Sequence, residues 1–291
     1  MGRFVTAALT CLAVMITLVA PRALADVAIP AGAAPTPDGP AEAWLVADMD
    51  SGEVLAARNE FDRYAPASTI KVLLALTALD ELALDATVVA DEADTKVECN
   101  CAGIAPGVTY TTRQLLEGLL LVSGNDAANT LATMLGGREA AIAKMNAKAV
   151  AVGATATTAG SPSGLDGPGI DVWTTPHDLA VIFRAALAHP VFAGITAQPT
   201  AVIPGRSGDR VLVNQDEMLA RYPGMLGGKT GFTDLARKTF VGAAQRDGRR
   251  LVVVLMHGLV REGGPTYWDQ ASALLDWGFA ADGRGPGVGT L

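Results

Sequence analysis

Hairpin signals near opposite ends of the chain constrain the fold more than any other feature. Short, partly apolar runs occur in two pairs: residues 43–48 with 53–58, and residues 238–245 with 251–257. The residues between them are Asp50-Ser51-Gly52 and Arg246-Asp247-Gly248-Arg249, and such turns favour antiparallel pairing. The simplest architecture joins all four strands in one antiparallel sheet. This predicts an α/β (α+β) fold whose middle section forms a separate lobe.

The middle of the chain has the pattern of buried helices. Residues 69–84 are apolar on nearly every face, which is typical of a helix that is buried all round. Further helices are expected over residues 113–122, 126–135 and 178–188, the last with Pro176 at its first position. A final helix over residues 265–280 is expected to cover the sheet. The domain would then span residues 42–281.

Both ends of the chain are expected to lie outside this domain. Residues 1–25 combine Arg3, an uncharged apolar run and Ala23-Leu24-Ala25, which is the pattern of a cleaved signal peptide, with an uncleaved anchor as the alternative. Residues 26–41 are rich in Ala, Pro and Gly and predict a flexible leader, and residues 282–291 a short tail. We therefore expect an exported protein of the periplasm, the cell wall or the medium.

The charge and the cysteines exclude several classes of partner. Removing residues 1–25 takes away Arg3 and Arg22 and no acid, so the net charge falls from −8 to −10, and no nucleic-acid partner is expected. Cys99 and Cys101 remain, and in an oxidising compartment they form either a small disulfide or two free thiols. No second Cys/His pair accompanies them, so we expect neither a zinc site nor another cofactor.

A serine and a lysine at the start of the buried helix are the first candidates for chemistry. Ser68 stands at its N-terminus, and Lys71 follows one turn later on the same face. Burial favours the neutral amine and can make Lys71 a base, while the free N–H groups of the helix end favour an oxyanion. The alternative is a Ser68 that caps the helix and a Lys71 whose amine reaches water.

Ser123-Gly124-Asn125 separates two predicted helices. It is either an ordinary helix end followed by a cap, or a tight turn at the edge of a cleft. In the second case Ser123 could relay a proton and Asn125 could hold an amide.

A glycine-rich segment, residues 228–231, comes before the second hairpin. It is similar to a phosphate loop, but Pro223 stands where that motif needs glycine, and strands follow instead of a helix. As part of a sheet strand it would present Lys229 and Thr230 as donors to a carboxylate, and its glycines would let a substrate backbone approach. The alternative is a turn with a solvated lysine.

Taken in order, the three motifs are far more specific than any one of them. S-x-x-K at residues 68–71, S-G-N at 123–125 and K-T-G at 229–231 resemble the low-molecular-mass penicillin-binding proteins, in particular the exported serine D-alanyl-D-alanine carboxypeptidases of mycobacterial type. Residues 66–71, 163–166 and 228–233 are similar to the family's supporting segments. The resemblance covers roughly residues 42–280 and implies a β-lactamase/DD-peptidase-like sheet with an all-helical lobe.

The resemblance also implies a role for each site residue. Ser68 would attack the carbonyl between the terminal D-alanines of a peptidoglycan stem peptide, Lys71 would take its proton, and Ser123 would pass the proton to the leaving amine. The substrate would be bound by the remaining site residues: Asn125 at an amide, Lys229 and Thr230 at the terminal carboxylate, Gly231 along the backbone, and Phe232 through its N–H beside the oxyanion. Penicillins are expected to acylate Ser68.

Several alternatives stay open. A class A β-lactamase needs a glutamate after the second motif, and none occurs between Glu139 and Glu217, so slow penicillin turnover is expected. A DD-transpeptidase or endopeptidase would use the same site with another acceptor. A non-catalytic penicillin-sensing module that binds the wall would keep only the shape. Residues 282–291 leave no room for the further domain and membrane helix of many members, so no stable membrane anchor is expected after signal cleavage.

Overall fold

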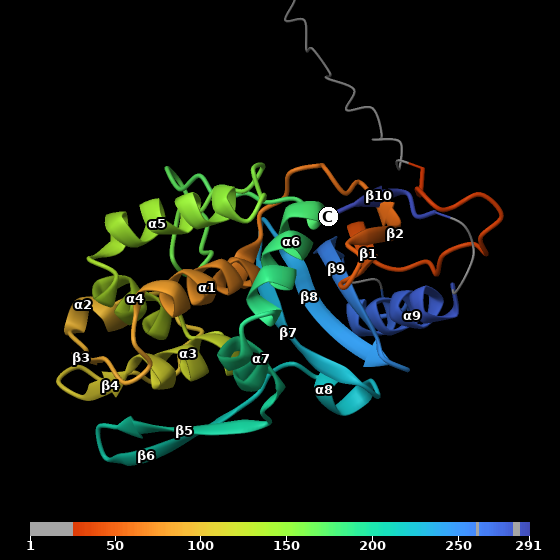
Figure 1. The fold of residues 1–291 in the computed structure, drawn as a ribbon. Helices are drawn as coiled ribbons and strands as arrows, with labels where there is room; N and C mark the ends of the chain where they lie inside the picture. The colour runs from red at the N-terminus through yellow and green to blue at the C-terminus, as the bar shows by residue number, and fades with distance from the viewer. Residues whose placement is uncertain (1–25, 260–261, 282–285) are drawn as a thin grey trace, which may run out of the picture.

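The computed structural model describes residues 26–259, 262–281 and 286–291; the predicted signal peptide lies outside them. Its centre is a six-stranded antiparallel sheet in the order β10-β2-β1-β9-β8-β7, with helices on both faces and a helical lobe beside it (Figure 1). The strands of this sheet are β1 (Ala41–Asp48), β2 (Glu53–Arg58), β7 (Met225–Thr233), β8 (Arg237–Arg246), β9 (Arg249–Gly258) and β10 (Gly289–Thr290).

Strands from the two ends of the chain pair as predicted. Within β1, Leu45 faces Ala57 of β2 on one side and Val254 of β9 on the other. The β8–β9 hairpin turns at Asp247 and Gly248, whose φ angles of 51° and 83° are both left-handed. Such two-residue turns match the twist of the flanking strands. The single antiparallel sheet predicted from the hairpin signals is therefore confirmed.

The central strands are apolar on both sides because both faces of the sheet are covered. In β1, Leu45 packs toward α1 (Lys71–Glu81) and α6 (Pro176–Leu187), while Trp44 packs toward α9 (Tyr267–Ala280). Successive side chains of a strand point to opposite faces, so a sheet between two helical layers needs near-continuous apolar runs. The terminal helix is α9, and Thr266 caps its N-terminus.

The helical lobe contains the other predicted helices. The run 69–84 forms a 3₁₀ turn, η1 (Ala67–Ile70), followed by α1, and the two later runs form α3 (Thr112–Leu121) and α4 (Asn125–Met134). The remaining elements were not predicted: β3 (Thr87–Val89), α2 (Glu92–Thr95), β4 (Thr109–Thr111), α5 (Arg138–Ala151), α7 (Pro190–Ala197), β5 (Thr200–Gly205), β6 (Gly208–Val213) and α8 (Met218–Arg221). Among the described residues no single helix is long and apolar enough to cross a membrane; α6 and α7 reach that length only as a pair bent by 101°.

The described parts of the predicted leader and tail contact the sheet. Ala28 forms an antiparallel bridge with Ala57, with N–H···O distances of 2.8 and 3.0 Å in the two directions. From the tail, β10 pairs with residues 53–54 of β2 (Figure 1). An edge strand has unpaired N–H and C=O groups that attract a further strand. The boundaries of 42 and 281 therefore leave out residues that pair with β2.

Candidate active site

The three motifs meet in one cleft of about 370 Å³ beside β7. Most predicted site residues line it: Ser68, Ser123, Asn125, Thr230, Gly231 and Phe232. The other two predicted site residues, Lys71 and Lys229, are buried. The described residues contain no group of three or more His, Cys, Asp or Glu side chains that could hold a metal ion.

Ser68 lies on η1 and follows a residue in an unusual conformation. Ala67 has a φ of 48°, in the left-handed region that non-glycine residues seldom adopt, and its side chain is fully buried. A side chain at Gly164 would collide with the Ala67 carbonyl, so this approach requires glycine. Neither η1 nor α1 has a side-chain cap. The interpretation of Ser68 as a helix cap is therefore wrong.

The Lys71 amine is enclosed and does not reach water. The residue is 0% exposed, and Nζ lies 2.6 Å from Ser68 Oγ, 2.7 Å from Asn125 Oδ1, 2.9 Å from the Ser163 carbonyl oxygen and 3.5 Å from Ser123 Oγ. The resemblance assigns proton transfer to Ser68, Lys71 and Ser123, and the Lys71 amine contacts both serine hydroxyls. Residues 163–166 are similar to a supporting segment of the family, but the sequence did not indicate that the Ser163 carbonyl contacts Lys71.

These contacts can satisfy a neutral amine. An uncharged NH₂ group has two hydrogens and one lone pair. The Asn125 and Ser163 oxygens are acceptors only and can take the two hydrogens, which leaves the lone pair for the Ser68 hydroxyl. Burial is the main cause that lowers the pKa of Lys71 well below 10.5; the charge of Lys229 adds to it and that of Asp126 opposes it. Lys71 is thus suited to accept the Ser68 proton.

Ser123 lies in the break between α3 and α4, and Asn125 is the first residue of α4. Ser123 has a left-handed φ of 60°, and Gly124 precedes α4 without a side-chain cap. Asn125 instead directs its carboxamide at the lysine, and its Nδ2 donates to the Glu98 carbonyl at 2.7 Å. The interpretation of this motif as a simple end and cap is wrong.

The third motif is a strand, as expected, and not a phosphate loop. Lys229 is opposite Val241 of β8 and is only 2% exposed, with Nζ donating to the Thr230 carbonyl at 2.8 Å. A Cβ on Gly231 would lie 2.8 Å from the Ser68 backbone nitrogen, so glycine allows the strand to approach the nucleophile. The Phe232 ring is exposed, with Lys238 Nζ 4.8 Å from its centroid.

Burial also sets the charge behind the cleft. It lowers the pKa of Lys229 to about 7, an effect that Asp216 opposes, and it raises the pKa of Asp216 to about 6. An anion placed beside Lys229 favours its protonated form. A carboxylate ligand bound here would therefore favour protonated Lys229 and pair with it. Asp216 carries no sequence signal that distinguishes it from a surface acid.

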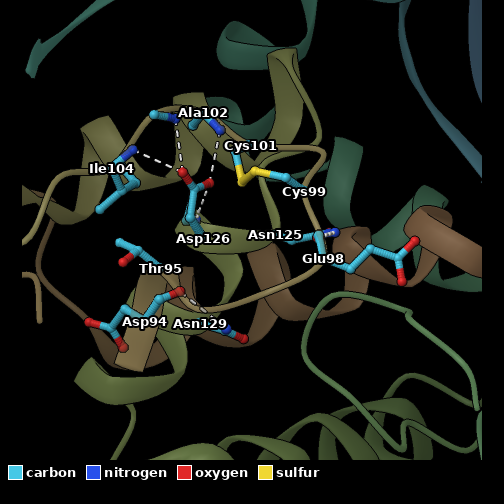
Figure 2. The surroundings of a disulfide bond; sticks show 12 residues. Asp94, Thr95, Glu98, Cys99, Cys101, Ala102, Ile104, Asn125, Asp126 and Asn129 are labelled. Carbon is cyan, nitrogen blue, oxygen red and sulfur yellow. Dashed lines mark hydrogen bonds between the residues drawn. A yellow bond between two sulfur atoms is a disulfide. The ribbon is translucent and has the colours of Figure 1, made fainter. Parts of the chain in front are cut away.

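The two cysteines form a disulfide in the wall of the cleft (Figure 2). The Cα atoms of Cys99 and Cys101 are 5.0 Å apart, and Cys99 lines the cleft together with Glu98 and Asn100. The bridge, which the sequence left open, is therefore closed in the structure.

The whole arrangement suits acyl transfer through a serine. The Ser68 hydroxyl contacts a buried amine whose pKa is lowered, the Gly231 backbone passes close to the Ser68 nitrogen, and a second buried lysine, Lys229, lies on the same strand as Gly231.

Comparisons with known proteins agree with this chemistry. A family model described as D-alanyl-D-alanine carboxypeptidase matches residues 31–259. A D-alanyl-D-alanine carboxypeptidase of Mycobacterium tuberculosis is 66% identical over 262 residues, which is 90% of this chain and 90% of that protein. The fold predicted from the sequence is confirmed by two solved structures.

The first is the crystal structure of a D-alanyl-D-alanine carboxypeptidase from Mycobacterium tuberculosis. It has a TM-score of 0.88 at 66% identity and covers 90% of this chain and 99% of that one. The second is a Streptomyces DD-transpeptidase with a TM-score of 0.78 at 26% identity, covering 85% of this chain and 100% of that one.

Proposed function

Because this chain belongs to the D-alanyl-D-alanine carboxypeptidase family and is a serine peptidase, we propose that its reaction runs through Ser68, Lys71 and Ser123. The observation that carries the proposal is the 2.6 Å contact between Ser68 Oγ and the Lys71 amine. Lys71 takes the hydroxyl proton while Oγ bonds to the substrate carbonyl carbon. Ser123 passes that proton to the leaving nitrogen, and the C–N bond breaks. Water then hydrolyses the ester as Lys71 removes its proton and Ser68 regains one.

The other site residues hold the substrate in this scheme. The terminal carboxylate binds Lys229 and Thr230, and the substrate backbone runs along Gly231. The oxyanion accepts hydrogen bonds from the backbone N–H groups of Ser68 and Phe232. Asn125 binds an amide of the penultimate unit. The substrates are peptidoglycan stem peptides that end in D-Ala-D-Ala, and β-lactams are expected to occupy the same positions.

A DD-transpeptidase is the second candidate, and the Streptomyces match supports it. The two activities share every step up to the acyl-enzyme and differ in whether water or an amine attacks the ester. A β-lactamase has less support, because the groups in hydrogen-bond contact with Lys71 are hydroxyl and amide oxygens instead of a carboxylate. The complete set of contacts around Lys71 also argues against a non-catalytic penicillin-sensing module.

The proposal is tested by changing one end of the substrate. The purified protein should release D-alanine from diacetyl-L-lysyl-D-alanyl-D-alanine. The same peptide with a terminal carboxamide should have a kcat/KM about 100-fold lower, because it loses a charged partner for Lys229. A peptide ending in D-Ala-L-Ala serves as the stereochemical control. Equal kcat/KM values for the acid and the amide would disprove the carboxylate site.

The pH dependence of kcat/KM follows from the two lysines. Lys71 works as a base only when neutral, so activity should fall as the pH drops through its lowered pKa. Lys229 binds a carboxylate best when protonated, so kcat/KM should fall again above a pKa of about 7. In the complex the bound carboxylate raises the pKa of Lys229, so the alkaline limb of kcat should lie at higher pH. A kcat/KM that changes by less than about tenfold between pH 6 and pH 9 would contradict this prediction.

We also propose that the enzyme acts outside the cytoplasm. The support is the signal-peptide pattern of residues 1–25 and the location of the proposed substrate in the cell wall. N-terminal sequencing of the protein recovered from its native cells should then begin at Asp26. A chain that still begins at Met1 would instead indicate an uncleaved anchor.

A further inference from the structure

The loop Glu98–Ile104 lines the cleft with its first three residues and holds Asn125 at two points (Figure 2). The Asn125 side-chain Nδ2 donates to the Glu98 carbonyl at 2.7 Å, and its backbone N–H donates to the Asn100 carbonyl at 2.7 Å. Its Oδ1 accepts from Lys71. The carboxamide therefore has one orientation, with its oxygen on Lys71 and one N–H on the loop. The second N–H is left for a ligand in the cleft that Asn125 lines.

The disulfide stands between the two carbonyls that hold Asn125. Glu98 directly precedes Cys99, and Asn100 lies inside the small ring that the bridge closes. Cys99 and Asn100 are exposed, so packing does little to fix their backbone. Within the part of the chain that the structure describes, residues 97–101 make hydrogen bonds only to Asn125. The ring closed by the disulfide is therefore the main remaining restraint on the orientation of the Glu98 and Asn100 carbonyls.

The loop beyond the ring is fixed independently of the disulfide. Asp126 is 1% exposed, and its carboxylate accepts the backbone N–H groups of three successive residues at 2.8 to 2.9 Å: Ala102, Gly103 and Ile104. On the other side, Asn129 donates to the Asp94 carbonyl at 3.2 Å. Both anchors belong to the α4 helix, which starts at Asn125 itself (Figure 2). Opening the disulfide would therefore free the short stretch that contacts Asn125, while the loop stays attached at both ends.

We propose that the Cys99–Cys101 disulfide is a positioning element of the active site, which holds the Glu98 and Asn100 carbonyls against Asn125 and so orients the carboxamide toward Lys71 and the substrate. The inference rests on the proposed function of Asn125. It predicts that an open disulfide slows acylation of Ser68 in a protein that remains folded. Asp126 is the second positioning residue, because it fixes the loop on the far side of the ring.

The test compares acylation by a fluorescent penicillin before and after reduction. A phosphine breaks the S–S bond, water supplies the oxygen of the phosphine oxide, and the two sulfurs leave as thiols. The second-order rate constant of acylation should fall about 10- to 100-fold, because small displacements of positioning groups have effects of this size. Oxidation should restore it. The C99S/C101S double variant should match the reduced parent and should not respond to phosphine.

A second comparison separates positioning from simple loss of structure. The Asn125→Ala variant removes the group on which the disulfide is proposed to act. Reduction should therefore change the acylation rate constant of this slow variant by less than about twofold, whereas the parent should lose about 10- to 100-fold. Circular dichroism at the assay temperature checks that each form is folded. A reduced parent that acylates at the oxidised rate would overturn the proposal, as would an equal fold-loss in Asn125→Ala. If the oxidised parent itself is not acylated, the proposed function has failed instead.

Discussion

The Ser68→Ala variant is expected to release no measurable D-alanine, with kcat/KM lowered by at least about 10⁴-fold. The covalent route disappears because alanine has no atom that can form the ester. The fold should survive, since the Ser68 side chain is half-buried and its hydrogen bond to Lys71 is worth about 1 kcal/mol. D-alanine release and thermal unfolding should be measured together on the parent and the variant.

Penicillin labelling gives the same prediction a second readout. The parent should gain the mass of one penicillin and keep it for hours, because no glutamate between Glu139 and Glu217 is available to activate water. The Ser68→Ala variant should gain no mass. Ser51→Ala, in the exposed turn between β1 and β2, is the matched control and should behave as the parent does. A Ser68→Ala variant that keeps a tenth of the activity would show that the nucleophile is another group.

The sheet and most of the helices were predictable because their signals are local. The turn at Asp247 and Gly248 requires two residues in the left-handed conformation, and an Asp-Gly pair is a sequence signal for such a turn. The run that forms α1 is apolar on nearly every face, and this pattern likewise predicts a buried helix. By contrast, α5 buries only Ala141, Met145 and Ala149, a narrow stripe of mostly small side chains that is hard to distinguish from a polar segment.

The site was predictable as a set of motifs but not as a set of contacts. The order of the three motifs predicted Ser68 and its partners as site residues. The enclosure of Lys71, however, depends on the Ser163 carbonyl, and any residue type can supply a carbonyl. Asp126 was missed for a similar reason. An acid in the first turn of a helix is so common that nothing marks one that binds three N–H groups of a distant loop.

Lys71→Met is the variant with the second large effect, an expected loss of about 10⁴-fold in the rate of acylation by penicillin. Methionine fills a similar space and cannot accept a proton, so Ser68 remains in place without its base. We expect this variant to show slow residual acylation by penicillin and no measurable release of D-alanine. The rate constants of the parent and the variant should be compared at the same pH, near 7.

A second measurement on this variant tests why Lys71 can be the base at all. Between its lowered folded pKa and 10.5, Lys71 carries a proton in the unfolded chain but not in the folded one. The unfolding free energy of the parent should therefore rise relative to the variant by about 1.4 kcal/mol per pH unit across that window, because folding releases one more proton in the parent. Denaturant unfolding at pH 7, 8 and 9 measures the difference. A difference that does not change with pH would mean that Lys71 stays charged in the folded protein, and the proton transfer proposed for it would then fail.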